Sequence, residues 1–322
     1  MMVTASAHAI AIKPNGIGLD PAIELRGLDW APGNTLLTPV GNASIFTHPV
    51  GDVFQLYTQA SLSGFRGSSG GLIESQGSNK WTYIAGYQEQ VVSTIGNSVV
   101  LGTIGGGDNF FKLYFDATPN TNVGNGTGFG PDATNSDPVL ILSGMIDAST
   151  GQTAISARNV LPGPLDNFGL DNYPGVKSIT AVGDSTYAVA IKGFDPGYFP
   201  EGLAAGLTLD FQTLFNVPFS QTDPSSCFNN GAGMLINGAG PNTLDGLECS
   251  VNTVGSINGI DGTNLILTSD SSAIFNQPSP LPEPMSLVLL GVGLAAMGAG
   301  KSRRKNQTLI AKAHKERDGK VE

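Results

Sequence analysis

One Asn- and Asp-rich stretch, residues 116–137, could supply oxygen ligands to a metal. Carboxylate and amide oxygens are the ligands that Ca²⁺ prefers. Their spacing matches neither an EF-hand nor the nonapeptide repeat of a calcium-binding β-helix. The competing interpretation is an ordinary long loop, because Asn and Asp accept turn conformations. The candidate calcium ligands are Asp116, Asn120, Asn122, Asp132 and Asp137, and no other cofactor is expected.

Groups for nucleophilic or acid–base catalysis are scarce. A Ser-His-Asp hydrolase would have to use His48, the only histidine between residues 10 and 281. The serines of residues 64–71 lack the nucleophile-elbow spacing. Glycoside hydrolysis requires two carboxylates at a defined separation, and nothing in the sequence brings Glu89 and Asp116 together. We therefore assign no catalytic residue and predict that the protein is not an enzyme.

The two cysteines, Cys227 and Cys249, fit a structural role better than a catalytic one. In an oxidising compartment a single disulfide is expected, and closing that loop would stabilise the fold by about 3 kcal/mol. A reactive thiol would need a neighbouring base.

Aromatic side chains could bind carbohydrate, because their rings stack on the apolar faces of sugars. The same residues could instead form core or cross-strand pairs. An exposed row of rings would favour the first interpretation. The candidate sugar contacts are Trp81, Tyr83, Tyr87 and Tyr114.

Short segments with two-residue alternation between Gly-rich turns must position these groups. They predict an all-β protein, a two-sheet, jelly-roll-like β-sandwich with long Gly- and Asn-rich loops. Residues 161–175 are predicted to be a long loop rather than a domain boundary. The predicted strands are Val53–Leu62, Trp81–Ile95, Asn109–Asp116, Pro138–Ile146 (apolar on both faces), Thr186–Phe194, Leu207–Phe215 and Thr263–Phe275.

The C-terminal region has a different character. Residues 285–300 carry no charge and would form a helix of ~24 Å, slightly short of the ~30 Å hydrocarbon core. A buried core helix is the alternative, but the run lacks a polar face and ends in basic residues. The basic cluster predicts a transmembrane helix with its C-terminal end in the cytoplasm. This cluster is Lys301, Arg303, Arg304 and Lys305.

Pro282, Glu283 and Pro284, followed by this apolar run and the arginines, resemble the PEP-CTERM sorting signal of Gram-negative bacteria. The resemblance implies a transient inner-membrane anchor, cleavage by an exosortase, and release to the cell surface or the exopolysaccharide matrix. Family tails usually stop soon after the arginines, whereas 17 residues follow Lys305 here. Residues 281–305 are thus the expected sorting signal and 306–322 a cytoplasmic tail.

Export also requires a signal peptide. Ala7-His8-Ala9 resembles the end of a cleavage site, so residues 1–9 are interpreted as the remnant of a leader with an upstream start. The exported β-domain is then expected to span residues 10–280. Residues 10–281 hold 8 Lys and Arg against 22 Asp and Glu, a net charge of −14. Such a surface repels phosphate backbones and excludes nucleic acid as a partner.

Residues 50–146 and 254–275 also resemble the flocculation-associated PEP-CTERM proteins of floc-forming bacteria, with an aromatic strand ending in Asp before an Asn- and Gly-rich loop. This resemblance implies a secreted, non-enzymatic protein that promotes adhesion or flocculation within exopolysaccharide. A secreted carbohydrate-active enzyme and a self-assembling surface protein are the two alternatives. A deep cleft with facing carboxylates would favour the enzyme, and an unpaired strand edge would favour self-assembly.

Overall fold

The structure is a computed structural model of the chain. All the residues that it describes fall within one compact unit, Ala5–Pro278. The described residues are 9–16, 21–43, 49–73, 80–131, 137–169, 173–233, 235–237, 243–244, 257–258 and 264–276.

These residues form an all-β structure, as predicted, and every predicted strand segment overlaps an observed strand over most of its length. Among them no helix is long and apolar enough to cross a membrane. The predicted span at residues 285–300 lies outside the described part. The strands are β1 (Ile10–Ile12), β2 (Ile23–Trp30), β3 (Gly33–Pro39), β4 (Val53–Gly67), β5 (Leu72–Ile73), β6 (Trp81–Ile95), β7 (Ser98–Ile104), β8 (Phe110–Phe115), β9 (Val139–Ile146), β10 (Gln152–Pro164), β11 (Lys177–Phe194), β12 (Thr208–Val217), β13 (Cys227–Asn229), β14 (Leu235–Asn237), β15 (Thr243–Leu244), β16 (Ile257–Asn258) and β17 (Leu265–Asn276).

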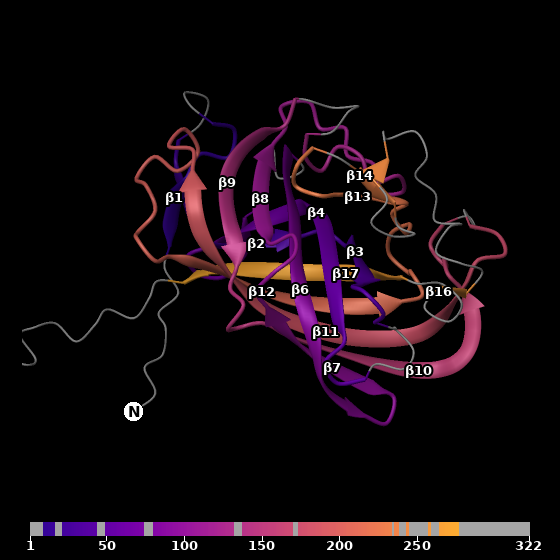
Figure 1. Ribbon diagram of the computed structural model, residues 1–322. Helices are drawn as coiled ribbons and strands as arrows, with labels where there is room; N and C mark the ends of the chain where they lie inside the picture. The colour runs from indigo at the N-terminus through magenta and orange to yellow at the C-terminus, as the bar shows by residue number, and fades with distance from the viewer. Residues whose placement is uncertain are drawn as a thin grey trace, which may run out of the picture. The chain divides into compact units, whose positions relative to one another are not determined.

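Fourteen strands form one continuous hydrogen-bonded sheet. All of its pairings are antiparallel except that between β11 and β16. The remaining three strands, β13, β14 and β15, form a small separate sheet. The large sheet curves strongly, so that strands far apart in sequence cross in Figure 1.

The curvature closes the sheet in two rings of pairings that share their longest strands. The first ring runs β9, β8, β6, β4, β2, β17, β12, β11 and back to β9. The second runs β3, β4, β6, β7, β10, β11, β12, β17 and back to β3. In most of the shared strands, one edge therefore pairs with two different neighbours along its length. For example, β6 pairs with β8 through residues 81–86 and with β7 through residues 88–95.

Aromatic side chains fill the interior of the first ring. Trp30 lies 4.6 Å from Tyr83 between ring centroids, edge to face, and Phe211 lies 5.4 Å from Tyr83. Phe211 also stacks on Tyr187 at 4.9 Å. Such pairs add to the stabilisation from burial. The two that involve Tyr83 connect strands that are not neighbours in the sheet.

Strands β4 and β9 do not show the burial of their two faces that their sequences suggest. Strand β4 buries both faces, because loops cover its outer side, where Gln55, Tyr57 and Gln59 are all less than 10% exposed. Strand β9 shows the reverse. It was predicted to be apolar and buried on both faces, but Val139 and Met145 are 49% and 45% exposed. Its position beside β8 and β11 buries only the inward side chains.

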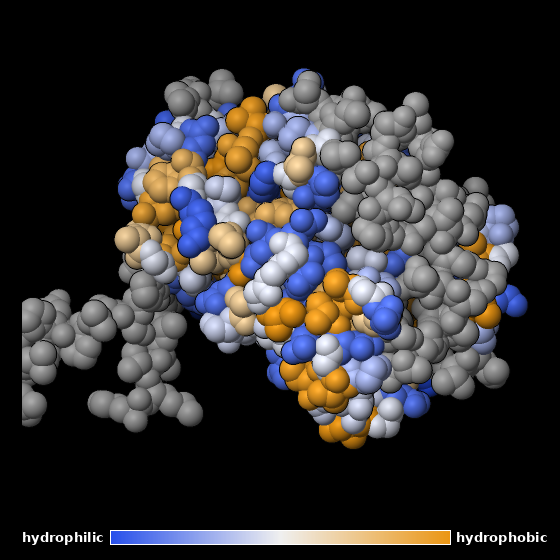
Figure 2. All heavy atoms as spheres, in the orientation of Figure 1, coloured by the Kyte–Doolittle hydropathy of each residue, from blue (hydrophilic) through white to orange (hydrophobic). Residues whose placement is uncertain are grey.

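Hydrophobic side chains also reach solvent at the end of the β6–β7 hairpin. Val92 and Ile95 are 51% and 73% exposed there. Figure 2 shows hydrophobic atoms gathered over this end of the molecule. The hairpin therefore extends past the packed interior.

Gln59 fastens the segment that contains Cys227 to the outer face of β4. Its Nε2 donates to the Cys227 carbonyl at 2.9 Å, and its Oε1 accepts from the Asn229 amide at 3.2 Å. A leucine at this position would leave both buried backbone groups without partners. We expect Gln59→Leu to lower the free energy of unfolding by about 2 kcal/mol in urea titrations. Gln90→Leu, which removes one exposed hydrogen bond, is the control and should change it by less than about 0.5 kcal/mol.

Candidate functional site

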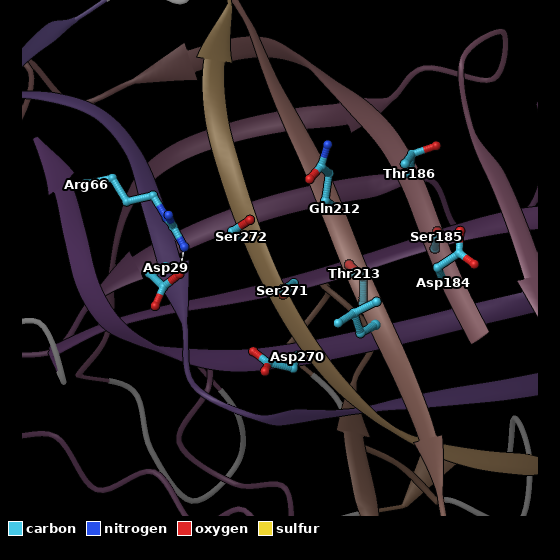
Figure 3. A pocket seen from close by; sticks show the side chains of 11 residues that line it. Asp29, Arg66, Asp184, Ser185, Thr186, Gln212, Thr213, Asp270, Ser271 and Ser272 are labelled. Carbon is cyan, nitrogen blue, oxygen red and sulfur yellow. Dashed lines mark hydrogen bonds and ion pairs between the residues drawn. The ribbon is translucent and has the colours of Figure 1, made fainter. Parts of the chain in front are cut away.

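A polar hollow lies on the outer face of the sheet, over β2, β4, β11, β12 and β17. Its volume is about 450 Å³. Figure 3 shows the side chains that line it, with Arg66 and Asp29 on one side and Asp184 on the other. The lining residues are Asp29, Arg66, Asp184, Ser185, Thr186, Gln212, Thr213, Leu214, Asp270, Ser271 and Ser272. We call this hollow the polar groove.

Strand register places an exposed leucine between two carboxylates, one on each neighbouring strand. Asp184 pairs with Leu214, and Leu214 pairs with Asp270. All three are exposed, and Leu214 is 65% exposed. Since neighbouring strands lie about 4.8 Å apart, the backbones of the two aspartates are about 10 Å apart. The row therefore presents an apolar surface flanked by two acceptors.

The next cross-strand row adds amide and hydroxyl groups. Thr186, Gln212, Ser272 and Asp29 follow one another across β11, β12, β17 and β2. Asp29 forms an ion pair with Arg66, which anchors one end of the groove. The row thus offers two hydroxyl groups, one amide and one carboxylate.

Charge accumulates at the β17 side of the groove. Partial burial raises the pKa of Asp270, and the neighbouring Asp29 raises it further. Arg66 faces Asp29, so the ion pair offsets one of these two negative charges. The described lining has three carboxylates and one guanidinium, and its net charge is negative.

A smaller polar hollow continues along the same face. Asp210 accepts hydrogen bonds from Thr208 at 2.9 Å and from the Asn276 amide. Arg26 lines the far side of this hollow. The face as a whole offers carboxylate, amide and hydroxyl groups at strand spacing, which suits a hydroxylated ligand such as a sugar.

The aromatic residues predicted as sugar contacts lie elsewhere. All are less than 4% exposed, so they cannot stack on a saccharide at the surface. Trp81 donates to the Pro14 carbonyl at 2.8 Å, Tyr83 packs in the interior, and Tyr114 packs against Phe129 under an outer loop. Tyr87 lies 5.1 Å from Tyr187, ring to ring. They are core residues, which corrects the prediction of sugar contact.

The candidate calcium ligands do not converge among the described residues. Asp116 is buried and accepts from the Thr118 amide at 2.8 Å. Asn122 instead accepts from the Asn125 amide at 3.2 Å in a turn. In the described part of the chain no three acidic, His or Cys side chains gather as a metal site. Asn120 and Asp137 also have partners, and Asp132 is not among the described residues.

The other predicted chemical groups are also separate from the polar groove. Glu89 lies in the interior, whereas Asp116 follows β8, whose Phe115 pairs with Trp81. Eight residues of β6 separate Trp81 from Glu89, so the two acids are roughly 27 Å apart along the strand.

Cys227 is disulfide-bonded. Cys249, the only other cysteine of the chain, lies outside the described residues, as do His48, the Pro282-Glu283-Pro284 motif and the basic residues from Lys301 to Lys305.

Comparison of the chain with protein-family models, with curated proteins and with solved structures gave no match. The groove therefore has to be interpreted from its own chemistry.

Sequence reasoning missed the groove, although a signal was present. In β12 the outward residues are Asp210, Gln212 and Leu214, and in β17 they include Asp270 and Ser272. Each set alternates with buried apolar or hydroxyl residues. A polar set on one face of consecutive strands is typical of any wet face, so alternation alone could not mark it as a site.

Proposed function

We propose that this protein is exported, sorted by an exosortase through its C-terminal signal, and acts without catalysis in exopolysaccharide-associated adhesion or flocculation. Residues 281–305 would hold the precursor in the inner membrane before release to the surface or the matrix. A two-sheet, jelly-roll-like sandwich arrangement of the β-domain and one C-terminal transmembrane helix belong to the same proposal. The sequence of residues 281–305 supports the proposed export and sorting.

The polar groove supports the binding part of this proposal. One sugar ring could lie on Leu214 while its hydroxyl groups donate to Asp184 and Asp270. Gln212 and Ser272 in the next row could contact a neighbouring ring. This row of an exposed leucine between two carboxylates is the observation that carries the assignment to saccharide binding.

Removing both carboxylate charges from the groove should weaken polysaccharide binding. We expect Asp184→Asn with Asp270→Asn to lower the affinity for exopolysaccharide of the producing bacterium about tenfold, because two charge-assisted hydrogen bonds become neutral ones. Binding would be measured by co-sedimentation at fixed ionic strength. Glu201→Gln, an exposed charge outside the groove, is the matched control. Equal binding by the double variant and the control would remove the groove from the proposal.

The sorting part has its own test. We expect Glu283→Ala to leave the protein in the membrane fraction, whereas the wild-type chain moves to the medium or the matrix. The measurement is cell fractionation with immunoblotting and intact-mass analysis, in cells with and without the exosortase. Unchanged release of the Glu283→Ala chain would contradict the assignment of this motif.

Neither alternative function gains support from the described residues. The groove lies on an outer sheet face, and one of its carboxylates is held in an ion pair with Arg66. Most long strands of the two rings have neighbours on both sides, although β10 pairs with β7 only through residues 152–156. These features agree better with a binding surface than with a hydrolase cleft or an edge-to-edge assembly.

A further inference from the structure

An acidic side chain lies in the interior of the sheet. Glu89 follows the inward-facing residues Tyr83 and Tyr87 on β6 and is 1% exposed. Its Oε1 accepts a hydrogen bond from Thr153 of β10 at 2.7 Å. Its Oε2 is buried and has no hydrogen-bond partner. A buried charge without a cation is costly, so the neutral carboxyl suits this place better.

Hydroxyl groups join Glu89 to the opposite wall of the interior. Thr153 also forms a hydrogen bond with Ser185 of β11 at 2.8 Å. Ser185 in turn is hydrogen-bonded to Tyr87 of β6. The chain of contacts therefore leaves β6, passes β10 and β11, and returns to β6. It ties β6 to β10 and β11, neither of which is its neighbour in the sheet.

Among the residues that the structure describes, no cation faces Glu89. Strand β4 presents Phe54 and β7 presents Thr103, each as a cross-strand partner of Glu89. Strands β10 and β11 present hydroxyls, and the titratable neighbour is the Tyr87 phenol, whose own pKa is raised by burial and by Glu89. The Thr103 hydroxyl, like Glu89 Oε2, is buried without a partner.

Imperfect packing lies beside this network. A cavity of about 50 Å³ is lined by Phe54, Leu101 and Ile155 among other apolar residues of the second ring. Phe54 pairs with Glu89, and Leu101 pairs with Thr153. A space of this size exceeds what one water molecule requires. Water could therefore reach the carboxyl through this end of the sheet after a local opening.

We propose that Glu89 is a proton-controlled latch: the neutral carboxyl holds β7 and β10 against β6 and β11, and its ionisation releases that end of the second ring. Burial raises the pKa of Glu89 to about 7, and the Thr153 hydrogen bond lowers it in part. In the opened state the carboxyl is solvated and returns towards its ordinary value of 4.5. Opening is then favoured as pH rises through this window.

Hydrogen exchange on the full chain tests the latch. After correction for intrinsic exchange rates, the opening constants of amides in β7 and β10 should rise on the order of 70-fold from pH 5 to pH 8, from linkage between the two pKa values. Amides in β12 and β17, on the far side of the ring, should open only through global unfolding, so their opening constants should lie well below those of β7 and β10 at both pH values. Glu89→Gln keeps the shape of the side chain without its ionisation and should abolish the rise.

Three results would overturn the latch. One is the same opening constant in all four strands, equal to that of global unfolding, which would show that β7 and β10 do not open on their own. Another is a flat response of β7 and β10 in the wild-type chain, which needs no variant and holds even if Glu89→Gln fails to fold. The third is an undiminished rise in Glu89→Gln.

Discussion

Gly27→Ala is expected to lower the free energy of unfolding by about 3 kcal/mol, at the upper end of the cost of overpacking. Gly27 lies in β2, where β4 and β17 pair on its two sides. A Cβ added there would lie 2.2 Å from the backbone oxygen of Ala273. Backbone cannot move aside as a flexible side chain can, so β2 or β17 must shift where the first ring closes.

Gly105→Ala is the matched control, because a Cβ at Gly105 meets nothing within 4 Å. Urea unfolding followed by circular dichroism would measure both variants, and the control should stay within about 0.5 kcal/mol of wild type. Equal stability of the two variants would show that β2 and β17 do not approach each other as described.

Alternation along single segments predicted most of the long strands. In β4 it correctly separated the inward Phe54 and Leu56 from the outward Gln55 and Tyr57. It failed to show that both faces are buried, because the cover comes from distant residues. Asp108 contacts Gln55 and Tyr57, and residues 227–229, more than 160 positions away, contact Gln59. Local pattern reports which residues share a face, whereas tertiary contacts decide whether that face is wet.

The polar groove depends on the same distant contacts. Asp29 and Asp270 lie near opposite ends of the sequence of the β-domain. They come close in space only because β2 pairs with β17. The pairing register between two such distant strands cannot be predicted from the sequence of either strand alone. By contrast, Glu89 could have been placed from sequence, since it alternates with Tyr87 and Val91 on the face that carries the aromatic core. An acid in such a series indicates either a functional group or a titrating core residue.

The same linkage predicts the pH dependence of global stability. Glu89 has a pKa of about 7 in the folded protein and 4.5 as its ordinary value. Below pH 4.5 both folded and unfolded states carry the proton, so this group adds no pH dependence. Between 4.5 and 7 only the unfolded state ionises, so stability falls as pH rises. Above 7 both states are ionised and the loss is complete, about 3 kcal/mol.

Glu89→Gln should remove this loss, because an amide does not ionise. We expect the variant and the wild-type chain to have similar stability near pH 4.5 and to diverge by about 3 kcal/mol at pH 8, with the variant the more stable. Urea titrations at half-unit pH steps would measure the difference, in which the contributions of all other ionisable groups cancel. If Glu89→Gln were less stable than the wild-type chain at pH 8, the folded protein would have to stabilise the carboxylate. A cation or ordered water would then reach the interior. A buried acid that weakens its own fold at neutral pH is consistent with a role beyond packing.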